Sequence, residues 1–170
     1  MKNFITILLL SILLNTILLS NDIAEINHVK QPNNIAIPLL KKIEKHSISF
    51  GSGKKIIYAF VDPMCPHSQN FIEMVYNNKN AKKIYTYKIF LLHLKKFDSK
   101  DVILKIYSDL DNINSNLIDF MVLSKNNINN KISTNKNSEK ISKEILIISN
   151  KLDIYKRPYL FVVKNPKEFE

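Results

Sequence analysis

The 170-residue chain has one cysteine, two glycines and no tryptophan. A single cysteine excludes an internal disulfide framework, and it excludes zinc or iron–sulfur sites that need several cysteines. Two glycines are too few for a collagen-like or linker-like chain, and no glycine-rich loop of the phosphate-binding kind is present. Acidic residues are also scarce, because 15 Asp and Glu face 25 Lys and Arg, which leaves a net charge of +10.

Hydrophobic residues make up 45% of the chain and charged residues 24%. This balance supports a buried core and excludes disorder as a description of the whole chain. The length fits one domain. The surplus lysines are interleaved with asparagine and isoleucine, which favours a solvated surface over a nucleic-acid site, and no nucleic-acid partner is expected.

The first 20 residues predict export. Lys2 supplies a short positive region, and residues 4–19 are almost wholly apolar. This run is shorter than the roughly 20 apolar residues of a spanning helix, so residues 1–20 fit a signal peptide. Ser20 suits a cleavage site but Leu18 does not, which leaves retention of residues 4–19 as an inner-membrane anchor as the alternative. Either way the rest of the chain is expected in the periplasm, where thiols are oxidised.

The hydrophobic pattern alternates between helix and strand periodicities. Residues 125–137 are polar and low in complexity, and we predict a loop there. Helices are expected over 35–46, 66–78, two stretches between 98 and 122, and 141–152, and strands over 55–61, 84–92 and 159–163. This alternation indicates an α/β fold with helices packed on a small sheet.

The candidate site lies in the segment FVDPMCPHSQNF, residues 60–71. A buried strand there delivers Cys65 to the start of a helix, and Pro66 suits the first helical turn. Free N–H groups and the positive end of the helix dipole favour a thiolate, which is the form that attacks disulfides. His67 is expected to add positive charge or a hydrogen bond at the sulfur. The alternative is that Cys65 is a small core residue.

A metal site is the weaker hypothesis for the same residues. Cys65, His67 and His93 would share a metal ion only if the end of the second strand lies close by, and their spacing is not typical of a metal site. We therefore expect neither a metal nor another cofactor.

The motif DPMCPHS resembles the active site of thioredoxin-fold periplasmic thiol–disulfide proteins, above all the catalytic domain of the DsbC/DsbG-like disulfide isomerases. In that family a strand runs into Asp, a spacer and Cys-x-x-Cys, and the dipeptide Pro-His is typical of the oxidase DsbA. The segments 38–60, 86–108 and 138–163 are similar to the family's linker helix and first strand, its second strand and helical insertion, and its cis-proline segment.

The resemblance implies a domain organisation. Residues 21–47 would form an N-terminal segment and linker helix, and residues 48–170 a thioredoxin-like α/β domain with a helical insertion at about 98–137. The N-terminal segment is too short for the isomerases' dimerisation domain, and the oligomeric state is left open. The chain ends soon after the strand over 159–163, so either the sheet is smaller, without the last strand and helix, or the sequence is divergent or incomplete there.

The resemblance also assigns Pro158 as a cis-proline that faces Cys65 and offers backbone groups to an extended substrate. Arg157 stands before it, where a small residue such as Thr is usual. Arg157 either holds a thiolate or a substrate carboxylate, or points to water. Tyr155 and Tyr159 either line a client groove or cover the core.

Ser68 stands where the family has its second cysteine. The chain therefore cannot carry the internal disulfide of an oxidase or resolve its own mixed disulfides, although Ser68 could donate a hydrogen bond to the thiolate. We expect monothiol exchange, either isomerase-like or releasing glutathione from protein cysteines. Its partners would be cysteine-containing exported proteins and a membrane thiol reductant. The alternative is a redox-inactive, chaperone-like binding or assembly factor for exported proteins.

Overall fold

The structure is a computed structural model that describes residues 28–123 and 133–163. The expected signal peptide lies outside the described residues. Among the described residues, no helix is long and apolar enough to cross a membrane.

A four-stranded sheet forms the centre of the molecule, with the strand order β1-β3-β2-β4. Its strands are β1 (Ile48–Phe50), β2 (Lys55–Val61), β3 (Tyr85–Leu91) and β4 (Tyr159–Val163). The central pair, β2 and β3, is parallel, and β1 and β4 flank it in antiparallel pairing. The three predicted strands are confirmed, whereas β1 was not predicted because three residues are too few to show a periodicity.

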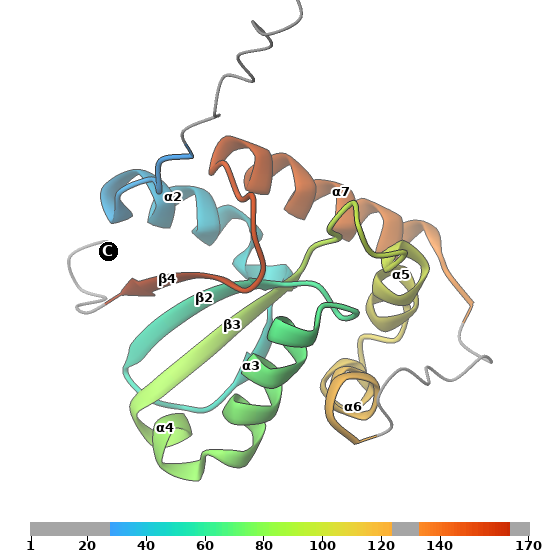
Figure 1. The fold of residues 1–170 in the computed structure, drawn as a ribbon, viewed down its shortest axis with the longest axis horizontal. Helices are drawn as coiled ribbons and strands as arrows, with labels where there is room; N and C mark the ends of the chain where they lie inside the picture. The colour runs from blue at the N-terminus through green and yellow to red at the C-terminus, as the bar shows by residue number, and fades with distance from the viewer. Residues whose placement is uncertain (1–27, 124–132, 164–170) are drawn as a thin grey trace, which may run out of the picture.

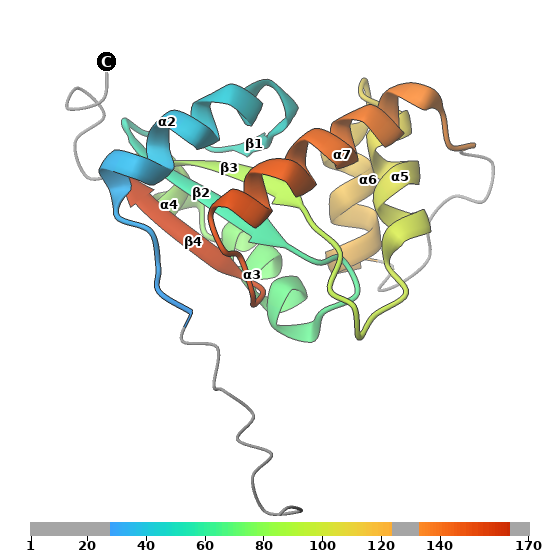
Figure 2. The same ribbon diagram turned by 90° about the horizontal axis from the view of Figure 1, so that it is seen from above.

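Helices cover both faces of this sheet. They are α2 (Asn33–Ile43), η1 (Glu44–His46), α3 (Pro66–Asn77), α4 (Lys79–Ile84), α5 (Lys100–Ser108), α6 (Ile113–Ile118), η2 (Asp119–Leu123) and α7 (Lys136–Lys151). Figures 1 and 2 show α2 and α7 on one face, α3 on the other, and α5 and α6 beside the sheet near the start of α7. This architecture confirms the predicted α/β fold.

Two local expectations are corrected. No helix was expected between residue 78 and the strand that follows, but a second helix, α4, begins at Lys79 because the Asn78 side chain accepts a hydrogen bond from the Ala81 N–H at 2.9 Å. The loop expected up to residue 137 ends earlier, because Asn135 and Ser138 form a capping box that starts α7. Residues 124–132 of that loop lie outside the described part.

The core positions the end of β2 rigidly. Residues Tyr58 to Val61 are buried, and β3 is held from the helical side by the Tyr107 hydroxyl, which accepts a hydrogen bond from the Leu91 N–H at 2.9 Å. At the other end, the turn before β2 packs so closely that a Cβ on Gly53 would lie 1.9 Å from the carbonyl carbon of Ile84.

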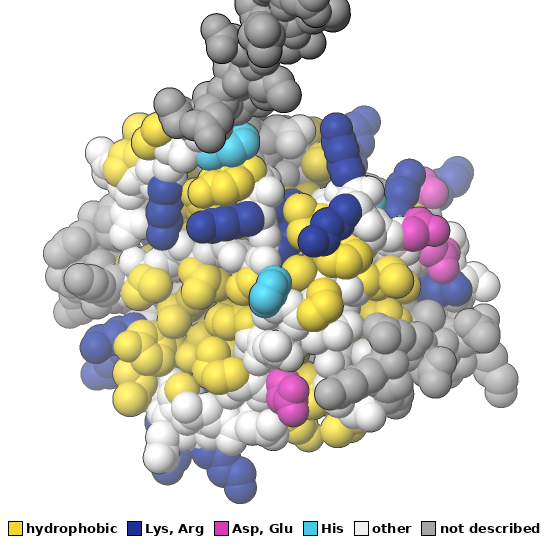
Figure 3. All heavy atoms as spheres, in the orientation of Figure 1, with side chains coloured by type: hydrophobic (Ala, Val, Ile, Leu, Met, Phe, Trp, Pro, Cys, Tyr) yellow, Lys and Arg dark blue, Asp and Glu magenta, His cyan; other side chains and the backbone are white. Residues whose placement is uncertain are grey.

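Figure 3 shows hydrophobic side chains gathered on the surface between β4 and α3.

Candidate functional site

Cys65 lies where β2 gives way to α3, as the sequence predicts. It is the N-cap residue of α3, with φ −82° and ψ 120°, and Pro66 is the first helical residue. The turn is closed by the Cys65 N–H, which donates to the Asp62 carbonyl at 3.0 Å. Because a helix leaves its first N–H groups without internal partners, the positive end of α3 lies next to the cysteine.

The loop before β4 covers the sulfur. Cys65 Sγ lies 3.9 Å from the carbonyl oxygen of Arg157, and the Arg157–Pro158 peptide bond is cis. The cysteine is only 3% exposed. Cys65 and Pro158, 93 positions apart in the sequence, are therefore brought to one place, and a partner sulfur would have to approach between α3 and this loop.

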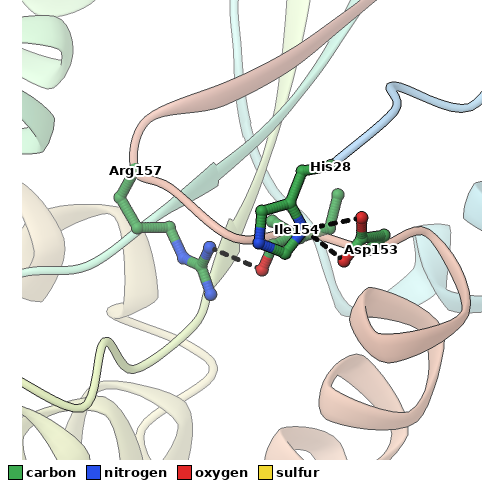
Figure 4. A network of polar contacts seen from close by, with 4 residues as sticks. All are labelled: His28, Asp153, Ile154 and Arg157. Atoms are coloured by element: carbon green, nitrogen blue, oxygen red, sulfur yellow. Dashed lines mark hydrogen bonds and ion pairs between the residues drawn. The ribbon is translucent and has the colours of Figure 1, made fainter. Parts of the chain in front are cut away.

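Arg157 does not point to water, which corrects one of its two expected orientations. It is 8% exposed, and its guanidinium donates to the carbonyls of Leu92, Ile154 and Lys156 at 3.2, 3.3 and 2.8 Å. Figure 4 shows the contact with Ile154. Burial lowers the pKa of Arg157 to about 10, and attraction to Asp62 and Cys65 opposes this shift. The group stays charged at neutral pH, so a buried cation lies beside the cysteine.

Asp62 is the residue whose role sequence reasoning missed. Its carboxylate is fully buried, accepting from the Met64 N–H at 2.9 Å on one oxygen and from the Leu94 N–H and Ser99 hydroxyl at 2.5 and 2.8 Å on the other. It joins the turn before Cys65 to the segment after β3. The signal in the sequence was an acidic residue directly after a run of buried apolar residues, since such a charge needs internal partners.

Ser68 is buried and faces this turn rather than the sulfur. Its hydroxyl oxygen accepts a hydrogen bond from the Asp62 N–H at 3.2 Å. Within the described residues no hydrogen bond joins Ser68 to Cys65, so the expected donation to the thiolate is not seen. The serine instead stabilises the turn that precedes the cysteine.

His67 is exposed on the first turn of α3, and no described residue forms a hydrogen bond or ion pair with its ring. The Nδ1 atom of His93 lies 3.2 Å from the Ser99 hydroxyl, and that hydroxyl donates to the Asp62 carboxylate. Across residues 28–123 and 133–163, no group of three His, Cys, Asp or Glu side chains gathers as a metal site would require.

Comparison with known proteins places this geometry in a structural context. No family model matches the chain, and no curated protein matches it in sequence. Solved structures do match in fold. The catalytic domain of Proteus mirabilis ScsC is 17% identical with a TM-score of 0.61, over 75% of this chain and 85% of that one.

Two further structures agree. A periplasmic thioredoxin-like protein from Salmonella enterica serovar Typhimurium is 13% identical with a TM-score of 0.60, over 80% of this chain and 88% of that one. Helicobacter pylori DsbG is 17% identical with a TM-score of 0.53, over 76% of this chain and 61% of that one. At such low identity the likeness concerns the fold alone, and the chain has the thioredoxin-like α/β fold of these structures.

Proposed function

We propose that the chain is a periplasmic thiol–disulfide exchange protein that acts through one nucleophilic cysteine, Cys65. The observation that carries this proposal is the position of Cys65 Sγ, at the N-terminus of α3 and 3.9 Å from the Arg157 carbonyl next to Pro158. The similar folds of ScsC and DsbG support it. The predicted signal peptide supports export, with an inner-membrane anchor as the alternative.

The reaction begins when the Cys65 thiolate attacks one sulfur of a client disulfide. A new S–S bond forms to Cys65, the old S–S bond breaks, and the leaving sulfur keeps the electron pair and takes a proton from solvent. A second client thiolate then attacks the client sulfur of the mixed disulfide and releases Cys65 as a thiolate. The client disulfide is rearranged with no net oxidation, so no external oxidant is needed.

The same first step removes a small thiol from a protein. If the substrate disulfide joins a protein cysteine to glutathione, Cys65 takes over the glutathione sulfur and the protein cysteine leaves as a thiol. A further thiol, from free glutathione or a membrane thiol reductant, then restores Cys65 by the same exchange.

The surrounding residues have separate parts in this proposal. Backbone N–H groups at the start of α3 and the buried Arg157 guanidinium favour the thiolate electrostatically. Pro158 supplies the backbone edge along which an extended client lies, and the exposed His67 ring lies on the first turn of α3, where it can donate a hydrogen bond at the site. Ser68 cannot resolve a mixed disulfide, so adducts on Cys65 should be long-lived.

The test is to incubate the full chain with a disulfide-linked peptide and to follow adducts by intact mass. We expect one peptide adduct per chain, lost in Cys65→Ser and persisting after the free peptide is removed. Ser68→Cys is the matched variant, because it supplies the family's second thiol and is expected to shorten the lifetime of the adduct. A wild-type protein that forms no adduct would overturn the proposal.

A redox-inactive binding or assembly factor is the second candidate. It is favoured by the near-complete burial of Cys65 and by the hydrophobic surface between β4 and α3 (Figure 3). Exposed apolar side chains on these two elements include Met74 at 45% and Val162 at 38% exposure. Suppression of client aggregation that is equal in wild-type and Cys65→Ser protein would favour this function over exchange.

A further inference from the structure

A pocket of about 240 Å³ opens beside Pro158. Its lining residues are Lys30, Tyr155, Lys156, Pro158, Tyr159 and Leu160. The pocket borders the candidate site, because Pro158 directly follows the residue whose carbonyl lies 3.9 Å from Cys65 Sγ. A group bound here would therefore lie next to the Arg157–Pro158 segment that contacts the sulfur.

One lining residue, Lys30, comes from the N-terminal segment, far in sequence from the rest of the lining. His28 fastens the segment to the loop before β4, since its Nδ1 lies 2.9 and 2.8 Å from the two carboxylate oxygens of Asp153 (Figure 4). Its ring also stacks on Tyr155 with the ring centres 4.1 Å apart. Two residues later, the Lys30 ammonium lies 5.9 Å from the centre of the Tyr159 ring. The fastening thus brings a lysine to the pocket.

The two lysines of the pocket, Lys30 and Lys156, form no ion pair within the described residues. Both ammonium groups instead lie over aromatic rings, Lys156 at 5.5 Å from the Tyr155 ring centre. The Asp153 carboxylate, whose charge acts on Tyr159, is bonded to His28 instead of a lysine.

One lining residue, Tyr159, also carries a hydrogen-bond donor that has no partner in the described part of the chain. The Tyr159 hydroxyl is buried and has no hydrogen-bond partner among the described residues. Burial raises the pKa of Tyr159, and electrostatic interactions with Tyr155 and Asp153 raise it further. The phenol therefore keeps its proton at neutral pH. A buried polar group without a partner is costly, and a bound acceptor that reaches the hydroxyl would remove that cost.

We propose that this pocket binds a carboxylate of the client that exchanges disulfides with Cys65. The carboxylate belongs to an acidic side chain near the reactive cysteine of this extended client. The inference rests on the proposed function. Two ammonium groups and one phenol O–H suit an acceptor-only anion, and a carboxylate is the anion that unmodified proteins carry.

The test compares three cysteine peptides that differ only in having Glu, Gln or Lys beside the cysteine. Each peptide cysteine is joined by a disulfide to an aromatic thiol, which is the leaving group. We expect Cys65 of the wild-type chain to react about fivefold faster with the Glu peptide than with the Gln peptide at low salt, and slowest with the Lys peptide. In Lys30→Gln/Lys156→Gln the Glu-to-Gln ratio should fall to about one, and Tyr159→Phe should lower it in part.

The matched control is Lys79→Gln/Lys83→Gln, which removes the same charge from α4, at the opposite end of α3 from Cys65. The Glu preference should survive in this variant, and an equal loss in both double variants would overturn the inference. Glutathione also carries carboxylates, so glutathione disulfide and its ethyl ester form a second pair. A rate lost on esterification, with no peptide preference, would assign the pocket to the small thiol instead of a client side chain.

Failure of the pocket and failure of the chemistry give different results. Equal rates with the Glu and Gln peptides overturn the pocket and leave exchange intact. If no peptide reacts, the proposed function fails, and the pocket is then tested on Cys65→Ser with serine versions of the peptides by fluorescence anisotropy. Tighter binding of the Glu peptide, abolished by Lys30→Gln/Lys156→Gln, supports the pocket, and equal binding overturns it.

Discussion

Replacing Asp62 with Asn tests whether its buried carboxylate holds the candidate site together. The substitution keeps the shape of the side chain, and its amide oxygen can still accept from the Met64 N–H. Its NH₂ group, however, would face the Leu94 N–H, which donates to the carboxylate at 2.5 Å, so donor would meet donor. Arg157 would also lose the negative charge that opposes the lowering of its pKa.

The expected cost can be worked from these losses. A hydrogen bond to a charged group contributes about 1.5–3 kcal/mol, and leaving a buried charge without its partner costs about 3–5 kcal/mol. The Ser99 hydroxyl can rotate to accept from the new amide, which recovers part of this. We therefore expect a loss of about 3 kcal/mol. With a urea slope of about 2 kcal/mol/M, the unfolding midpoint should fall by about 1.5 M.

The assay is urea unfolding followed by circular dichroism, with the exposed Asp111→Asn as the charge-matched control, whose midpoint should not move. Arg157→Met and the double variant Asp62→Asn/Arg157→Met complete a double-mutant cycle. If the two groups stabilise each other, the double variant loses at least about 1 kcal/mol less than the sum of the single losses. An Asp62→Asn midpoint shift below about 0.3 M would refute the reasoning.

Three further predictions concern the scaffold. Gly53→Ala places a Cβ 1.9 Å from backbone, so we expect a loss of at least about 2 kcal/mol in thermal unfolding, and an unchanged Tm would contradict the close approach. Burial raises the pKa of Tyr107, so above about pH 10 the unfolded chain gives up a proton that the folded chain keeps, and stability falls as pH rises. Near-ultraviolet absorbance should then show tyrosinate appearing on unfolding. The fall in stability with pH should be smaller for Tyr107→Phe. Full ionisation of the tyrosines in the folded state would argue against a raised pKa of Tyr107. Asn135→Ala removes the cap of α7 and should cost about 1 kcal/mol in urea unfolding, whereas Asn137→Ala, inside the helix, should cost nothing; equal effects would speak against the cap.

The sequence predicted those parts of the fold that local patterns determine. The strands β2 and β4 are continuous apolar runs that end at Asp or begin after Pro, so their limits could be read directly. The helix α4 was missed because its asparagine- and lysine-rich start shows no apolar periodicity, and its cap by Asn78 is a geometric feature. The positions of Cys65 and Pro66 followed from the same local logic.

The electrostatics of the site could not be predicted in this way. Arg157 donates to Leu92, 65 residues away, and His28 bonds to Asp153, 125 residues away. Contacts over such separations depend on the packed fold, and no pattern within a window of the sequence encodes them. For the same reason the orientation of Arg157 stayed open and the partners of Asp62 could not be named, although its place directly after an apolar run indicated burial.

The three carbonyls bound by Arg157 have a consequence for the entropy of client binding. They belong to the segment after β3 and to the loop before Pro158, so one side chain joins two loops that lie beside Cys65. A client that docks on these loops does not have to order them, and more of its contact energy remains as affinity. Without the guanidinium, binding would have to order these two loops, and this loss of conformational entropy would weaken association even if every client contact stayed the same.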